Sequence, residues 1–158
     1  MGNRINLYIL GINCAYHESS ACLVKNGKIL AYAEEERLNR VKHAKKSLIN
    51  NPDILPVKSI DYCLKAAKIT GSDINKVGFS FSPLKRLQNI NVNEEKANNN
   101  WGTKTGEELF YKKLLSIPKK LKKVLHNNHL DFDWVDHHIC HAASSFFISP
   151  FSESAILV

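Results

Sequence analysis

The chain has 158 residues, of which 44% are hydrophobic and 23% are charged, and its formal net charge is +7. This length suits one domain or part of a larger one, and the near-ordinary composition excludes a wholly disordered or fibrous protein. No apolar run approaches the roughly 18 residues that suggest a membrane span, and the start lacks the apolar core of a signal peptide. Four widely spaced cysteines without a CxxC pair indicate reduced thiols. We therefore expect a cytoplasmic protein.

The first third of the chain predicts three paired strands. Apolar runs at residues 6–13 and 19–25 are followed by Asn26-Gly27 and a further β-prone run, KILAYAEEE. An Asn-Gly pair between two such runs is a strong signal for a type I′ hairpin turn, because both turn positions take positive φ. We expect the first strand to lie beside this hairpin. The loop between the first two strands centres on His17.

The middle of the chain predicts helices, a strand and a loop. The basic stretch RLNRVKHAKKS has no strand pattern and predicts a loop or a short helix. Residues 56–70 predict a helix, with Pro56 at its start and Gly71 just past its end. Residues 76–82 predict a short strand. Residues 86–106 are rich in asparagine and predict a surface loop or insertion.

The last third predicts two helices and two strands. Residues 107–126 predict a helix interrupted at Pro118, because proline cannot continue the hydrogen-bond ladder. Residues 133–136 predict a short strand and residues 137–147 a helix. An apolar run at residues 154–158 begins another strand. Because the chain stops within that run, we expect an N-terminal piece of a longer protein.

The positive charge is concentrated in two places. Residues 101–130 hold seven lysines and two acidic residues, which supply +5 of the +7. Such a stripe can bind nucleic acid, but it is more often the solvated face of a helix, and we expect no nucleic-acid partner. The second cluster suits either an anion or solvent. It comprises Arg37, Arg40, Lys42, His43, Lys45 and Lys46.

The sharpest local motif is DHHICH at residues 136–141. On a helix, His137 and His141 are four residues apart, so they lie on one face and can meet one ion. Imidazole suits zinc, iron, nickel and copper. His138 points about 100° away and could contact a ligand. The spacing alone also suits surface or core histidines, and two ligands do not hold a catalytic ion.

His17 is the second candidate for chemistry. It lies in a loop between two predicted strands, where ligands are commonly met. A histidine there can act as a general base or contact a phosphate. A turn histidine without a role is the alternative.

Two long stretches of the chain resemble one known family. GINCAYHESSACLVKNGKILAYAEEERLNRVKH and DHHICHAASSFFISPFSESAILV are similar to segments of the nodulation-type and antibiotic-type O-carbamoyltransferases, the NodU/CmcH family. PVKSIDYCLKAA resembles the helix between them. The likeness spans the chain apart from the asparagine-rich segment.

This resemblance implies an α/β fold of the actin/hexokinase/Hsp70 class, a truncated ribonuclease H-like subdomain with a mixed sheet and flanking helices. Residues 1–158 would be the N-terminal portion of a catalytic domain that transfers a carbamoyl group to a substrate hydroxyl. In the family, a separate YrdC-like domain makes the donor, carbamoyl-adenylate, from carbamoyl phosphate and ATP. That domain is absent here. Because the metal site and the nucleotide site are each incomplete, we expect the fragment alone to be inactive. The full-length form could be a homodimer.

The resemblance also implies roles for single residues. His137 and His141 would bind a divalent metal, typically Fe(II), together with an aspartate beyond Val158. His17 would belong to the transfer site as the catalytic base. Apart from the resemblance, we expect contacts with the adenylate donor from the loop residues Asn13 and Ser19, from the basic residues Arg40 and Lys42, and from His138.

Two other functions stay open. One is a relative of the tRNA threonylcarbamoyl-adenosine synthases or an actin-like ATP-binding domain, although a sugar kinase would carry an acidic phosphate loop where His17 stands. The other is a non-catalytic binding module that uses the lysine-rich helix, for which a salt-dependent affinity for DNA or RNA would be evidence.

Overall fold

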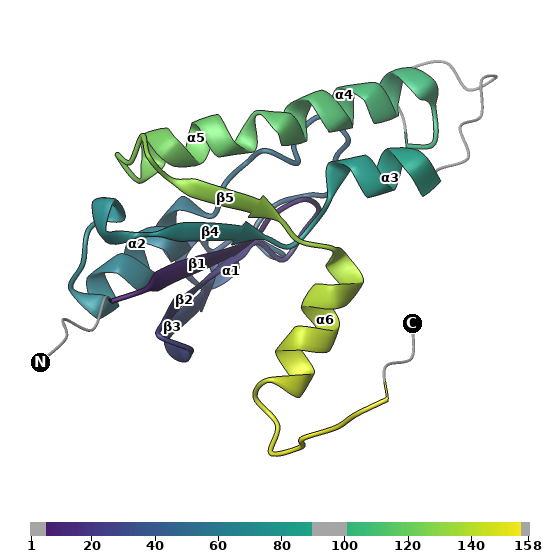
Figure 1. Cartoon of the computed structure of the whole chain (residues 1–158). Helices are drawn as coiled ribbons and strands as arrows, with labels where there is room; N and C mark the ends of the chain where they lie inside the picture. Colours follow the sequence, from purple (N-terminus) through teal and green to yellow (C-terminus); the bar gives the residue numbers. More distant parts are fainter. Residues whose placement is uncertain (1–5, 90–100, 156–158) are drawn as a thin grey trace, which may run out of the picture.

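A mixed β-sheet organises the structure, a computed structural model that describes residues 6–89 and 101–155 (Figure 1). The strand order is β3-β2-β1-β4-β5. The strands are β1 (Tyr8–Asn13), β2 (Ser20–Lys25), β3 (Lys28–Glu34), β4 (Lys76–Phe79) and β5 (Asp131–Trp134). The first three pair antiparallel, whereas β4 and β5 run parallel to β1. This topology agrees with the ribonuclease H-like sheet that the resemblance implied, and it confirms the α/β class.

The predicted hairpin is confirmed. Asn26 and Gly27 connect β2 to β3 with φ values of 48° and 79°, the positive values that a type I′ turn requires. The side-chain Oδ1 of Asn26 accepts a hydrogen bond of 2.9 Å from the amide of Leu7. The turn is therefore tied to the chain entering β1, the strand that pairs with β2.

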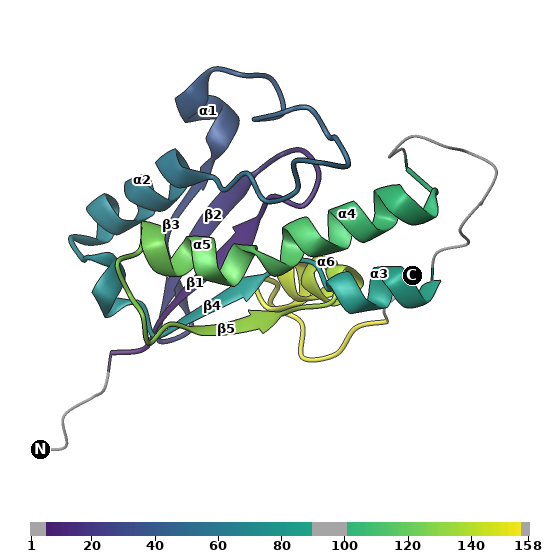
Figure 2. The same cartoon turned by 90° about the horizontal axis from the view of Figure 1, so that it is seen from above.

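The helices gather mainly on one face of the sheet. They are α1 (Glu35–Asn39), α2 (Val57–Ala67), α3 (Pro83–Asn89), α4 (Lys104–Leu115), α5 (Ile117–Val124) and α6 (His137–Phe146). Figures 1 and 2 show α4 and α5 lying over this face. The core lies between it and the helices, and its fully buried side chains include Leu10, Leu23, Phe79, Phe110 and Leu121. Helix α6 follows β5, points away from the sheet and buries none of its residues.

The predicted break at Pro118 is also confirmed. Helix α4 ends at Leu115, and α5 begins at Ile117 with Pro118 as its second residue. Proline is tolerated in a first helical turn, because an amide there has no partner within the helix. The break therefore allows one lysine-rich stretch to form two helices that both pack on the core.

Several boundaries differ from the prediction. Residues 86–89 complete α3 and residues 104–106 begin α4, so the predicted loop over 86–106 is wrong at both ends. Thr103 starts α4 by accepting a hydrogen bond of 3.1 Å from the amide of Gly106 through its side chain. Strand β5 lies two residues earlier than predicted, because residues 131–134 pair with β4. Of the strand predicted at 154–158, residues 156–158 lie outside the described part.

The structure contains no helix, within residues 6–89 and 101–155, of the length and apolarity that a membrane span demands.

Candidate functional site

Three parallel strands end at the edge of the sheet where most of the predicted site residues lie. Strand β1 ends at Asn13, Ser80 follows β4, and Asp136 follows β5 and begins α6. Ligands of open α/β sheets bind outside such carboxyl ends. Asn13 joins two of these strands, because its Oδ1 accepts a hydrogen bond of 2.9 Å from Ser80 Oγ. Its Nδ2 donates to the carbonyl of Glu18 at 3.1 Å.

Asp136 determines where α6 begins. Its Oδ1 accepts hydrogen bonds from the amides of His138 and Ile139 at 2.9 and 3.2 Å, and its Oδ2 lies 2.7 Å from Lys85 Nζ. Lys85 and these amides hold the pKa of Asp136 below its ordinary value. The cap makes His137 the first helical residue, so the predicted spacing of four residues falls on one helical face.

The two metal candidates meet. The Nε2 atoms of His137 and His141 lie 3.0 Å apart, and the Nδ1 atom of His137 lies 3.1 Å from the carbonyl oxygen of Ser80. A carbonyl only accepts, so His137 carries its proton on Nδ1 and keeps a lone pair on Nε2. This orientation by a carbonyl is typical of metal-ligating histidines.

The donor set fits a metal ion only in part. Nitrogen–metal distances of about 2.0–2.1 Å allow two nitrogens at this separation to share one ion. Within the described ranges, no three His, Cys, Asp or Glu side chains come together as ligands for one ion. His137 and His141 therefore supply two ligands, and a catalytic ion would need a third.

His138 lies beside this pair. Its side chain, with that of His137, lines a hollow of about 340 Å³. The other lining residues include aromatic rings and two cations, and they are Tyr16, Phe81, Ser82, Lys85, Arg86 and Asp136. His137 and His138 therefore both face this hollow.

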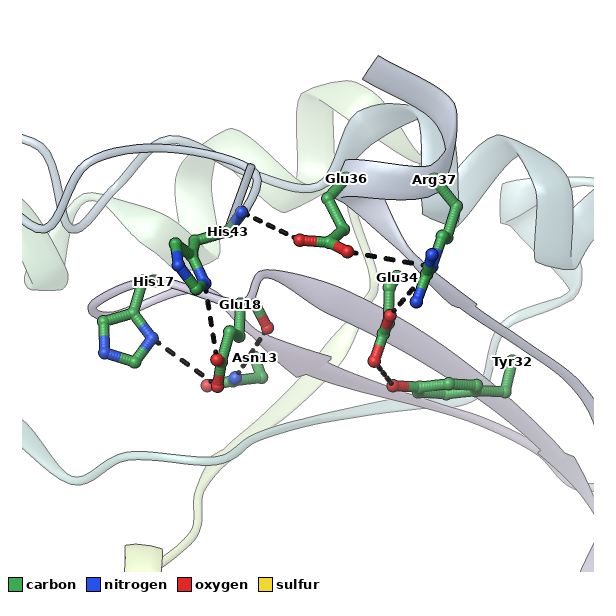
Figure 3. A network of polar contacts seen from close by, with 8 residues as sticks. All are labelled: Asn13, His17, Glu18, Tyr32, Glu34, Glu36, Arg37 and His43. Carbon is green, nitrogen blue, oxygen red and sulfur yellow. Dashed lines mark hydrogen bonds and ion pairs between the residues drawn. The ribbon is translucent and has the colours of Figure 1, made fainter. Parts of the chain in front are cut away.

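His17 is exposed and lies next to a carboxylate (Figure 3). Glu18 Oε2 lies 3.5 Å from His17 Nδ1, and Glu18 Oε1 lies 3.5 Å from His43 Nδ1. His43 comes from the basic stretch after α1, far along the chain. The sequence prediction assigned no role to Glu18 and placed His43 only in a basic cluster. No local pattern could have joined them, because their contact depends on the path of two loops.

The remaining candidates have different positions. Lys42 lines a second hollow, of about 480 Å³, together with Asn13, Glu18 and His43. Arg40 is exposed, caps the end of α1 at φ 62° and is not part of that lining.

Ser19 is buried, and its Oγ has no hydrogen-bond partner among the described residues. Of the four residues expected to contact the donor from this side, Asn13 and Lys42 line one hollow, whereas Arg40 and Ser19 are not part of its lining.

Arg86 was predicted in a surface loop, and that prediction is wrong. Its Nε and Nη2 atoms lie 2.7 and 2.9 Å from the two oxygens of Glu107, which is only 2% exposed. Its Nη1 donates to the hydroxyl of Tyr16 at 2.9 Å. Such a bidentate pair of arginine and carboxylate fixes the relative orientation of the two side chains. The pair joins α3 to α4, and Arg86 also lines the hollow beside His138.

Comparison with known proteins gives one family. Residues 8–158 match the family model described as the carbamoyltransferase N-terminus. The chain is 32% identical over 168 residues to the uncharacterized protein sll1178 of Synechocystis, covering 95% of this chain and 25% of that protein. It is also 32% identical over 161 residues to the nodulation protein NolNO of Sinorhizobium fredii, covering 92% of this chain and 19% of NolNO.

A third relative and one solved structure are more limited matches. An uncharacterized 19.2 kDa protein of Rhizobium etli is 37% identical over 67 residues, covering 42% of this chain and 34% of that protein. Among solved structures, YeaZ from Pseudomonas aeruginosa is similar with a TM-score of 0.44 and 12% identity, covering 89% of this chain and 49% of that chain. The chain spans a quarter or less of the length of sll1178 and NolNO.

Proposed function

Because the chain belongs to the carbamoyltransferase family, whose N-terminal domain it matches over residues 8–158, we propose that the complete protein transfers a carbamoyl group to a substrate hydroxyl. The donor is carbamoyl-adenylate, made from carbamoyl phosphate and ATP by a further domain. The observation that carries this proposal is the meeting of His137 and His141 at 3.0 Å, at the carboxyl ends of the parallel strands. It supports a metal-assisted transfer site at this edge of the sheet.

The bonds exchanged in the transfer are few. The hydroxyl oxygen of the acceptor attacks the carbamoyl carbon, the bond from that carbon to the adenylate phosphate oxygen breaks, and AMP leaves. His17 takes the hydroxyl proton as a general base, in its neutral form. Its loop position, exposed and flanked by Glu18, leaves the ring open to an acceptor.

His137 and His141 would hold the divalent ion, for which Fe(II) is our first expectation. When bound, such an ion polarises the carbamoyl carbonyl as a Lewis acid. The carbonyl of Ser80 accepts from His137 Nδ1, which leaves the lone pair of His137 Nε2 to bind the ion. Asn13 and Lys42 line the second hollow, where they would contact the donor.

The metal content of the complete protein tests the proposal. We expect about one ion per chain, reconstituted with Fe(II) under anaerobic conditions. In His137→Ala/His141→Ala, the ion should be lost, because a remaining carboxylate cannot hold it alone. Carbamoyl transfer from carbamoyl phosphate and ATP should fall by about 100-fold or more.

The control is His129→Ala, since His129 is exposed and remote from the pair. Equal metal content in the double variant and the wild type would refute the metal site.

A further inference from the structure

One carboxylate stands between two imidazoles where the β1–β2 loop meets the basic stretch (Figure 3). Each oxygen of Glu18 faces the Nδ1 atom of a different histidine, Oε2 toward His17 and Oε1 toward His43, both at 3.5 Å. The two rings lie 5.8 Å apart, centroid to centroid. The carboxylate is thus held from two sides.

The backbone locks the same junction. The amide of Glu18 donates to the carbonyl of His43 at 2.8 Å, and the carbonyl of Glu18 accepts from Asn13 Nδ2 at 3.1 Å. Glu18 and His43 adopt φ values of 55° and 60°, in the left-handed region that residues with side chains rarely occupy. Such strain persists where the surrounding contacts over-determine the conformation, and it clusters at functional sites.

His43 is held from the opposite side as well. Its amide donates to Glu36 Oε2 at 2.8 Å, and Glu36 Oε1 lies 3.7 Å from Arg37 Nε. The basic stretch is therefore fastened to α1 just before it meets the β1–β2 loop. The backbone of His43 is therefore fixed at the point from which its imidazole contacts Glu18.

The contacts stabilise the fold little. The side chains of His17, Glu18 and His43 are 55%, 63% and 51% exposed, and exposed ion pairs contribute little to stability. Their effect is on orientation. A carboxylate accepts hydrogen bonds only, so the nitrogen that faces it carries the proton. With its proton on Nδ1, His17 would keep the lone pair of Nε2 available to an acceptor hydroxyl.

We propose that Glu18 and His43 are positioning residues for His17, with Glu18 selecting its tautomer and His43 holding the carboxylate in place. This inference rests on the proposed transfer function. The distance of 3.5 Å exceeds that of a typical hydrogen bond, and catalytic hydrogen bonds are often long in a ligand-free site and tighten only in the substrate complex.

The test measures the tautomer of His17 by imidazole ¹⁵N chemical shifts in the complete protein. We expect the Nδ1–H form in the wild type and a mixture of forms in Glu18→Ala. Acylation of His17 Nε2 by diethyl pyrocarbonate should slow about twofold or more in this variant, because fewer of the rings then carry the lone pair on Nε2. Glu18→Gln keeps an acceptor oxygen and should restore most of the tautomer preference. His43→Asn should give an intermediate result.

The control is Asp61→Ala, which removes an exposed carboxylate whose partner is Lys65 at 2.6 Å. Thermal melting should be the same in all variants. A wild-type-like tautomer and acylation rate in Glu18→Ala overturns the proposal, and if this variant does not fold, unchanged behaviour of His43→Asn overturns the role of His43. Neither readout needs carbamoyl transfer. A positioned His17 in a protein without transfer therefore refutes only the proposed function.

Discussion

Arg86 and Glu107 show how much one residue pair can organise. The guanidinium carbon of Arg86 lies 5.8, 5.2 and 5.3 Å from the ring centroids of Tyr16, Trp101 and Phe110. Glu107 also accepts from the amide of Gly102 at 2.9 Å. Glu107 is therefore fully partnered in a place with almost no water. Its partners include both the guanidinium and the chain entering α4.

Removing the charge of Glu107 should destabilise the protein strongly. Glu107→Gln leaves the guanidinium of Arg86 without a counter-charge, and breaking a buried pair from one side costs about 3–5 kcal/mol. We expect a loss near the lower end of this range, because the Arg86 side chain is 23% exposed. Urea unfolding at neutral pH measures it. The matched control is the exposed neighbour Glu108→Gln, which should change stability by less than about 0.5 kcal/mol. Equal effects of the two variants would contradict a structural role of the pair.

At the scale of elements, the start of α6 depends on one cap. Asp136→Ala removes the acceptor for the amides of His138 and Ile139. We expect hydrogen exchange in the first turn of α6 to become faster and the two metal candidates to lose their common orientation. Asp136→Asn keeps the oxygen and should preserve protection, although it loses the ion pair with Lys85. Unchanged exchange in the alanine variant would show that α6 does not need the cap.

A glycine joins two other elements. Gly71 lies in the short 3₁₀ turn Gly71–Asp73 after α2, and a Cβ atom there would lie 2.1 Å from the carbonyl oxygen of Leu125. The obstacle is backbone at the end of α5, which cannot rotate away. Gly71→Ala should therefore destabilise by about 1–3 kcal/mol or more, as overpacking does.

Gly11→Ala is the control for that substitution. A Cβ atom on Gly11 would lie 3.7 Å from the carbonyl oxygen of Cys22, an ordinary contact. Thermal unfolding should show a lower midpoint for the Gly71 variant alone. If both variants melt together, the turn and α5 are not in close contact in solution.

For the whole molecule, the core should respond to alkaline pH. Burial raises the pKa of the Cys14 thiol to about 12 and that of Cys63 to about 11. Both thiols are protonated when folded, but ionise near pH 8.5–9 when unfolded. The stability that depends on these protonated thiols is fully present below that range. It is lost as the pH rises toward the pKa values of the folded protein. Each thiol should lower the unfolding free energy by about 1.4 kcal/mol per pH unit there.

Chemical unfolding from pH 8 to pH 11 checks this expectation. Cys14→Ala lowers stability at all pH values. It should also make the unfolding free energy fall less steeply with pH, by about 1.4 kcal/mol per pH unit. An identical slope in the variant would mean that Cys14 is accessible to solvent when the protein is folded. The same burial should keep Cys14 and Cys63 unreactive toward thiol reagents until the protein unfolds.

Features that depend on neighbours along the chain could be predicted from the order of the residues alone. Asn26-Gly27 predicts its turn because few residue pairs accept two positive φ values. Pro118 predicts a helix break because its ring and missing amide act within one turn. His137 and His141 share a helical face because the period of the helix alone places them there. The long family motifs, read with the same residues, indicated the fold class and the family.

Contacts between distant segments could not be predicted in this way, because they depend on how the chain folds. Ser80 orients His137 because β4 ends beside the start of α6, and Glu18 meets His43 because two loops cross at one edge of the sheet. Arg86 pairs with Glu107 across a segment that reads as a polar loop. The hydrophobic periodicity of a sequence does not predict such contacts, since they follow from strand order and from the path of the chain. The arrangement around the candidate histidines therefore becomes visible only in the folded molecule.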